Sequence, residues 1–190
     1  MKRIVWFMHV SLDGFVTDSN GSMAWVNVDA ELFDYAGKQT ERSDTALYAR
    51  KTFELMEGYW PTAADQPNAS KHDIEHSTWY KQVNKYVISG SWAGKSVPNA
   101  TLISEHVVDE IRKLKQGEGK DIVIFGSPSL GKLLTSENLI DDYWIFVNPI
   151  ILGEGGIPLF KDIKTRTALK LVSSIAFSSG VVGLHYEAKR

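Results

Sequence analysis

The sequence has no cysteine among its 190 residues, which excludes disulfide bonds, thiolate metal sites and a cysteine nucleophile. It also lacks an excess of charge of either sign, because 21 Lys and Arg residues face 23 Asp and Glu residues for a net charge of −2. No long run of basic residues is present to attract nucleic acid or an anionic membrane, so we expect neither as a partner. Any anion must therefore bind through local groups.

Long apolar runs are absent as well. The N-terminal segment MKRIVWFMHV is too short to cross a bilayer, and no small-residue cleavage site follows it at residues 11–14. We interpret this segment as a buried strand and expect a cytoplasmic protein. With 43% hydrophobic residues and no convincing linker, residues 1–190 are expected to form a single domain.

The sequence does contain an alternation of strand and helix patterns. The expected strands are 3–10, 46–48, 83–89, 101–103 and 122–125, and the expected helices are 30–39, 52–57, 72–82 and a segment around 107–114, with a surface loop at 61–70. Two alternating runs at 168–177 and 181–187 predict a terminal antiparallel hairpin. This order indicates an α/β domain with a mixed, mostly parallel central sheet flanked by helices.

Three of the predicted strands end in residues suited to an anion. In an open parallel sheet, ligands bind at the carboxyl ends of the strands, so these segments could converge on one nucleotide. A helix start directly after a strand offers free N–H groups and the positive end of the helix dipole. For each segment alone, an ordinary solvated turn is the alternative. The segments are Arg50-Lys51-Thr52, Ser89-Gly90-Ser91 and Gly126-Ser127-Pro128-Ser129-Leu130.

Two of these segments carry a more specific signal. Arg50 and Lys51 stand at a helix start, where acidic residues are normally preferred, and a bound anion would explain the inversion. Ser127 is placed to cap a helix that has Pro128 in its first turn, and Gly126 allows a ligand close to the backbone.

The motifs resemble those of a known superfamily. YARKTFE resembles the Gly-Arg-Lys-Thr-Trp segment of dihydrofolate reductases, and VSLDGFV resembles the Ser-Leu-Asp-Gly motif in the reductase domain of riboflavin-biosynthesis proteins. Residues 121–160 resemble that reductase domain in the order of their features. These are a strand, a Leu-rich helix, an acidic pair, a strand, and a Leu-Gly-x-Gly turn ending in Leu-Phe. The chain departs from the pattern at Ala49 and Ser127, which replace glycines, and we therefore expect backbone approach to a cofactor to differ at both positions.

The resemblance implies a dihydrofolate-reductase-like, three-layer fold that binds NADPH and forms a homodimer. Carried over by position, Arg50 and residues Ser89, Gly90 and Ser91 would face the adenosine 2′-phosphate. Lys51 and Thr52 would face the pyrophosphate, and Gly126, Ser127, Ser129 and Leu130 the pyrophosphate and nicotinamide ribose. The resemblance implies reduction of a small heterocyclic or sugar-derived substrate, like 5-amino-6-(5-phosphoribosylamino)uracil. A pterin reductase and a non-catalytic nucleotide-binding module are the alternatives.

Two acidic residues are the catalytic candidates. Asp13 follows the first strand and could orient the nicotinamide or donate a proton, with an Asp-Gly turn as the alternative. Glu31 lies about where dihydrofolate reductases carry the acid that holds the pterin, with a dipole-favoured first-turn acid as the alternative. The expected substrate contacts are Trp25, Asp34, Tyr35, Gly153 and Gly155.

A histidine pair is the remaining metal candidate. His72 and His76 are four residues apart and could share a helix face. Without a HExxH pattern or a third ligand, we interpret the pair as an exposed helical face and expect no metal. The sequence also lacks a GxGxxG fingerprint, a Walker A loop and a GxSxG elbow.

Overall fold

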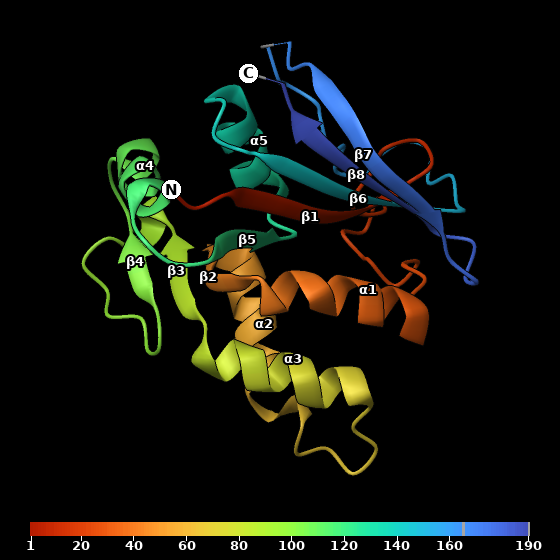
Figure 1. The fold of residues 1–190 in the computed structure, drawn as a ribbon, viewed down its shortest axis with the longest axis horizontal. Helices are drawn as coiled ribbons and strands as arrows, with labels where there is room; N and C mark the ends of the chain where they lie inside the picture. The colour runs from red at the N-terminus through yellow and green to blue at the C-terminus, as the bar shows by residue number, and fades with distance from the viewer. Residues whose placement is uncertain (165, 190) are drawn as a thin grey trace.

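The computed structural model describes residues 1–164 and 166–189, and it shows one eight-stranded sheet with helices on both faces (Figure 1). The strands are β1 (Ile4–Ser11), β2 (Ser43–Ala49), β3 (Asn84–Ile88), β4 (Thr101–Ile103), β5 (Asp121–Phe125), β6 (Asp142–Asn148), β7 (Leu169–Ala176) and β8 (Val182–Ala188). The helices are α1 (Ala30–Glu41), α2 (Arg50–Ala63), α3 (Lys71–Gln82), α4 (Val107–Gln116) and α5 (Pro128–Ser136), with a short 3-10 turn at Gly90–Trp92.

The strands follow the order β4-β3-β2-β5-β1-β6-β8-β7 across the sheet. The six strands from β4 to β6 are parallel, and β8 and β7 continue the sheet in antiparallel pairing. The predicted mixed α/β sheet with a C-terminal antiparallel hairpin is therefore confirmed. Because the six strands are parallel, their carboxyl ends all lie along the same edge.

Both faces of β1 are buried, which explains its nearly continuous apolar sequence. On one face, Trp6 belongs to a core that includes residues of α4 and α5. On the other face, Phe7 belongs to a core that includes residues of α1, α2 and α3. Figure 1 shows α1, α2 and α3 together below the sheet and α5 above it. His9, two residues after Phe7, therefore points toward the α1–α3 side.

Helix α2 is longer than predicted. It begins at Arg50 and runs to Ala63, so the expectation of a loop starting at Pro61 was wrong for its first residues. Proline removes one backbone hydrogen bond within a helix, but Trp60 packs against His72 and His76 of α3 in the same turn. These contacts hold the last turn in place, and the local proline signal is overridden by tertiary packing.

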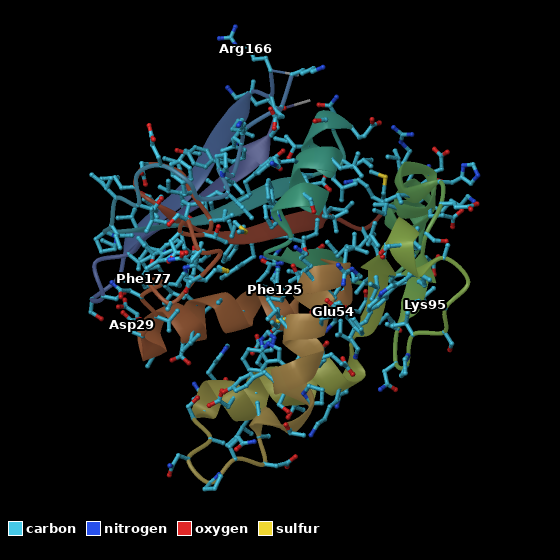
Figure 2. The ribbon with its side chains drawn as sticks, turned by 180° about the vertical axis from the view of Figure 1, so that it is seen from behind. Asp29, Glu54, Lys95, Phe125, Arg166 and Phe177 are labelled. Atoms are coloured by element: carbon cyan, nitrogen blue, oxygen red, sulfur yellow. The ribbon has the colours of Figure 1, made fainter. Side chains whose placement is uncertain are left out.

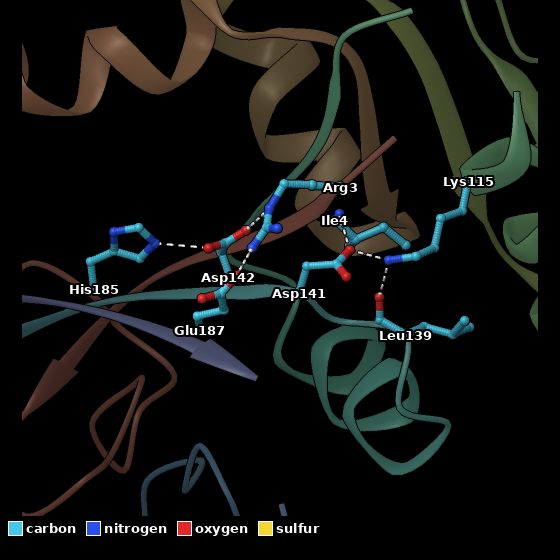
Figure 3. Close-up of polar contacts among 8 residues, drawn as sticks. All are labelled: Arg3, Ile4, Lys115, Leu139, Asp141, Asp142, His185 and Glu187. Atoms are coloured by element: carbon cyan, nitrogen blue, oxygen red, sulfur yellow. Dashed lines mark hydrogen bonds and ion pairs between the residues drawn. The ribbon is translucent and has the colours of Figure 1, made fainter. Parts of the chain in front are cut away.

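Ion pairs fasten the amino ends of the central strands, at the edge opposite the strand ends singled out above (Figure 3). Arg3 bonds to Asp142 and Glu187 at 2.7 and 2.9 Å, which joins β1, β6 and β8. Lys115 of α4 pairs with Asp141, whose carboxylate also accepts the backbone N–H of Ile4 at 2.7 Å. None of the helices within residues 1–164 and 166–189 is long and apolar enough to cross a membrane.

Candidate cofactor and substrate site

The starts of α2 and α5 abut at the carboxyl edge of the sheet. The backbone N–H of Ala49 donates to the hydroxyl of Ser127 at 3.0 Å, and this hydrogen bond joins the β2–α2 turn to the β5–α5 turn. A Cβ added to Gly126 would lie 3.7 Å from the Cγ2 of Thr52, so these two residues also face each other. Two of the three predicted anion-binding segments are thus side by side.

Neither helix start is satisfied from within its own helix. In the segments that form α2 and α5, both described in full, neither N-cap side chain bonds to its first turn and no acidic residue lies there. By contrast, α1 and α3 have side-chain caps from Asp29 and Ser70, and each has an acidic residue in its first turn. Free N–H groups and two positive dipole ends are therefore left together at this edge.

Ser127 does not cap α5 with its side chain as predicted. The backbone of Ser127 is in the left-handed conformation, with φ of 50°. Its hydroxyl accepts a hydrogen bond from the backbone N–H of Ala49 instead. The preceding Gly126 also has a positive φ, of 61°. Ser127 thus keeps the conformation that glycine favours, and the hydrogen bond to Ala49 helps to offset the strain.

Trp6 of β1 packs against the start of α5. Its indole N–H donates to the carbonyl oxygen of Gly126 at 2.9 Å. Its ring also fills the space beside Gly131, where an added Cβ would lie 2.0 Å from the indole Cε2. The sequence contained no signal for this contact beyond a glycine inside a helix, which often marks close packing.

Arg50 lies beside the third segment. Its guanidinium is 6.0 Å from the ring centroid of Trp92, which directly follows Ser91, and the hydroxyls of Ser89 and Ser91 are 3.1 Å apart. The guanidinium also bonds to Glu54, one turn further along α2, at 2.9 and 3.1 Å. Both partners of this pair are partly exposed, so the pair contributes little and can be exchanged for a phosphate.

The other predicted cofactor contacts differ in how they can reach a ligand. The side chains of Lys51 and Ser129 are exposed at the two helix starts. Leu130 is 3% exposed and packs in the core below α5, so that it can offer a ligand only its backbone N–H.

Asp13 fastens the loop after β1 to the glycine run. Its carboxylate accepts hydrogen bonds from the Ser11 hydroxyl at 2.6 Å and from the N–H groups of Leu152 and Gly153 at 3.2 and 2.8 Å. The Ser11 bond, followed by the backbone bonds, lowers the pKa of Asp13 below its usual value. The group is therefore ionised at neutral pH, which favours an orienting role over proton donation. Gly155 lies near Ser19 of the same loop.

The remaining candidates lie on or before α1. Glu31 accepts the N–H of Ser178 at 3.3 Å, and Asp34 pairs with Lys71 of α3 at 2.8 Å. Tyr35 packs on Trp144, with ring centroids 5.1 Å apart. Trp25 bonds to the carbonyl oxygen of Ser22. Figure 2 shows Asp29 at the start of α1 close to Phe177, so this end of α1 faces the β7–β8 turn.

A cavity of about 140 Å³ lies between the sheet and helices α1, α2 and α3. It adjoins the two helix starts, because Phe125 lines it and directly precedes Gly126. Met56 and Trp60 line it from the same face of α2 as Thr52, at intervals of four residues. The sequence motifs indicated residues of α1 at the site but not Met56 or Trp60. The lining is Phe7, His9, Leu32, Phe33, Ala36, Thr40, Met56, Trp60, His72, His76 and Phe125.

The interpretation of His72 and His76 as an exposed face was wrong. His76 is only 6% exposed, and His72 stacks on Phe33 with ring centroids 3.9 Å apart. Sequence reasoning missed that α3 covers α1 and α2, which turns this polar-looking face inward. Within the described residues, no three His, Cys, Asp or Glu side chains are grouped as a metal site requires.

A larger cavity, of about 560 Å³, lies at the other end of these helices. It shares Thr40, His72 and His76 with the smaller cavity and extends toward Asp44 and Asn84, at the amino ends of β2 and β3. Because this is the sheet edge opposite the paired helix starts, we do not assign it to the candidate site.

The sheet order and the paired helix starts define a dihydrofolate-reductase-like fold, and solved structures share it. A putative riboflavin biosynthesis protein from Shewanella sp. PV-4 matches with a TM-score of 0.72 at 24% identity over 100% of both chains. Dihydrofolate reductase from Enterococcus faecalis, complexed with NADP(H), matches with a TM-score of 0.64 at 13% identity over 99% of this chain and 97% of that chain.

The family is shown by sequence. The model of the RibD C-terminal domain matches residues 2–183, and the chain belongs to this family, as the motifs predicted. It is 35% identical to the uncharacterized protein YyaP of Bacillus subtilis (strain 168) in an alignment of 190 positions that covers 97% of this chain and 94% of that protein. A deaminase/5-amino-6-(5-phosphoribosylamino)uracil reductase from Thermotoga maritima shares the fold, with a TM-score of 0.69 and 14% identity over 99% of this chain and 57% of that one.

Proposed function

We propose that this protein is an NADPH-dependent reductase that transfers hydride to a small carbonyl or imine compound. The observation that carries the proposal is the pair of abutting, uncapped helix starts at the carboxyl edge of the sheet. Family membership supports a reductase-like domain. The NADP(H) complex of the E. faecalis relative supports the choice of cofactor.

The residues at this edge fit the phosphates of such a cofactor. The first-turn N–H groups of α2 and α5 can donate to the pyrophosphate, and Gly126 lets it approach the backbone. The planar guanidinium of Arg50 can donate two hydrogen bonds to the 2′-phosphate, beside the hydroxyls of Ser89 and Ser91. When bound, NADPH supplies the hydride.

The test compares Arg50→Ala with a matched control. Arg42→Ala removes an exposed arginine just before the amino end of β2, at the opposite edge of the sheet. We expect Arg50→Ala to weaken NADPH binding about tenfold or more and NADH binding little, since only NADPH has the 2′-phosphate. Arg42→Ala should change neither. Tryptophan fluorescence titration measures both affinities, and equal weakening of NADPH and NADH by Arg50→Ala would remove Arg50 from the 2′-phosphate site.

Turnover separates an enzyme from a binding module. With NADPH bound, oxidation of the cofactor is followed by absorbance in the presence of cyclic carbonyl, aminopyrimidine and pterin substrates. Oxidation that depends on one of these classes supports the reductase. Binding of NADPH without oxidation by any of them would instead favour a non-catalytic module.

The expected homodimer is also a proposal. Edge strand β7 presents Leu171 and Val172, each 51% exposed, and a paired or covered edge is the usual fate of such a strand. Light scattering of the wild type and of Leu171→Lys tests this, with the variant expected to be monomeric.

A further inference from the structure

The cavity beside the paired helix starts has the size of one ring. Its volume of about 140 Å³ is close to the cavity of about 150 Å³ that holds a benzene molecule in an engineered protein. Aromatic side chains line it on three sides, among them Phe33, Trp60 and Phe125. Helix α3 closes the end away from the strand edge through His72 and His76. The enclosed part therefore accommodates one planar six-membered ring.

The cavity carries no charge. None of the described residues that line it is Lys, Arg, Asp or Glu. Burial lowers the pKa of His9 to about 4 and that of His76 to about 3, so both imidazoles are neutral at pH 7. A phosphate or carboxylate inside the cavity would lose its hydration without meeting an opposite charge, which is costly.

The proton position on His9 is fixed by its neighbours. The backbone N–H of Asn27 donates to Oδ1 of Asn148 at 2.8 Å, so the NH₂ group of Asn148 lies on the other side of its amide. That NH₂ group faces the carbonyl oxygens of Val10 and Phe146 and lies 3.3 Å from Nδ1 of His9. Because an NH₂ group only donates, Nδ1 of His9 accepts and the imidazole proton is on Nε2. His9 therefore keeps one N–H donor for a ligand.

His76 provides a second polar atom. Its Nε2 is fully buried and has no hydrogen-bond partner among the described residues. A buried polar atom without a partner is costly, and a bound water or a ligand can supply the missing hydrogen bond. Since His76 lines the cavity, a ligand there could supply the partner.

We propose that this cavity binds an uncharged, planar six-membered ring with a ring carbonyl, whose oxygen accepts a hydrogen bond from Nε2–H of His9. The proposal rests on the proposed reductase function and names its substrate class. In the reduction, hydride from NADPH adds to a ring carbon conjugated to the carbonyl, and the electron pair moves to the oxygen. A proton from water completes the product, and the cofactor leaves as NADP⁺.

His9 acts here as a neutral hydrogen-bond donor. As negative charge develops on the oxygen, a preorganised N–H in a site of low dielectric stabilises it. Triosephosphate isomerase uses a neutral imidazole in the same way. The absence of cations among the described lining residues excludes a ring whose phosphoribosyl group must lie inside the cavity.

Three probes of similar size test the ligand class: cyclohex-2-enone, cyclohexene and cyclohex-1-ene-1-carboxylate. Affinities are measured by ligand-observed saturation-transfer NMR, without cofactor. We expect the enone to bind about fivefold tighter than cyclohexene, as one neutral hydrogen bond of about 1 kcal/mol predicts, and the carboxylate not to bind. A carboxylate that binds as tightly as the enone overturns the proposal, and so does cyclohexene that binds as tightly as the enone.

Two variants locate the binding. His9→Phe keeps a planar ring but removes the donor, so the enone should fall to the affinity of cyclohexene. Ala36→Leu, at a lining residue of α1, fills the cavity and should abolish binding of both neutral rings. An enone that binds Ala36→Leu as it binds the wild type would place its site elsewhere and overturn the proposal.

A measurement on the wild type does not depend on how the variants fold. Imidazole ¹⁵N NMR should show His9 with its proton on Nε2, and this signal should shift on adding enone but not on adding cyclohexene. A proton on Nδ1 of His9 would overturn the assignment. NADPH binding is measured on the same samples. NADPH binding without enone binding defeats only this inference, whereas enone binding without NADPH binding defeats only the cofactor proposal.

Discussion

Acidification should destabilise this protein through His9 and His76, the two histidines of lowest pKa in the cavity beneath the sheet. An unfolded chain protonates histidine near pH 6.5, whereas the folded protein resists protonation of His9 until about pH 4 and of His76 until about pH 3. Between pH 6.5 and these lower values the unfolded state binds more protons than the folded state does. The free energy of unfolding therefore falls as the pH falls below 6.5. From pH 7 to pH 5 each histidine costs about 2 kcal/mol, since about 1.36 kcal/mol per pH unit acts over about 1.5 units.

The assay is urea unfolding at pH 7 and pH 5. We expect the wild type to lose about 4 kcal/mol from the two histidines between these conditions, with a further loss in the same direction from His72, whose pKa is also lowered by burial. In His76→Asn, which cannot titrate, the loss should shrink by about 2 kcal/mol. His106→Asn is the control, because His106 is exposed and has a φ of 49°, a conformation that asparagine tolerates. A His76→Asn protein with the same pH dependence as the wild type would refute the argument.

Three further changes test the packing and the site. Gly131→Ala should lower the free energy of unfolding by about 1–3 kcal/mol because its Cβ would overlap Trp6, whereas Gly58→Ala, in the exposed middle of α2, should raise it by up to about 1 kcal/mol; denaturant titration measures both. Lys115→Met should cost about 3–5 kcal/mol in the same assay by leaving buried Asp141 without its ion pair, and the exposed control Lys113→Met should change stability by less than about 0.5 kcal/mol. Asp13→Asn should lower turnover with NADPH affinity unchanged in steady-state kinetics, and unchanged turnover would remove Asp13 from the catalytic candidates.

Sequence patterns predicted the fold because each signal was local. Asp29, a residue type favoured at a helix N-cap, directly precedes the expected helix over 30–39, and its side chain accepts the N–H of Leu32 at 2.7 Å. The alternating runs at the C-terminus form the expected hairpin of β7 and β8. The family motifs added the assignment that local patterns alone could not supply.

The cavity could not be predicted in this way because its lining comes from five elements of the fold, β1, α1, α2, α3 and β5. His9 looks like an isolated polar residue in a strand, and His76 like part of an exposed face. Only the packing of α3 across α1 and α2 buries His76, and only the contact with Asn148, 139 residues away, orients His9. The sequence signal that could have found them is weak: a histidine on the same strand face as Phe7, and two histidines at an interval of four.

The position of β1 in the sheet has a consequence for how the protein is made. β1 is synthesised before the other strands of this sheet, yet both of its partners, β5 and β6, begin more than a hundred residues later, at Asp121 and Asp142. During translation the backbone N–H and C=O groups of β1 stay unpaired, and its apolar side chains uncovered, until most of the chain has left the ribosome. Such non-local pairing slows folding and prolongs exposure to aggregation. We therefore expect the nascent chain to depend most on chaperones before β5 and β6 have been synthesised and can pair with β1.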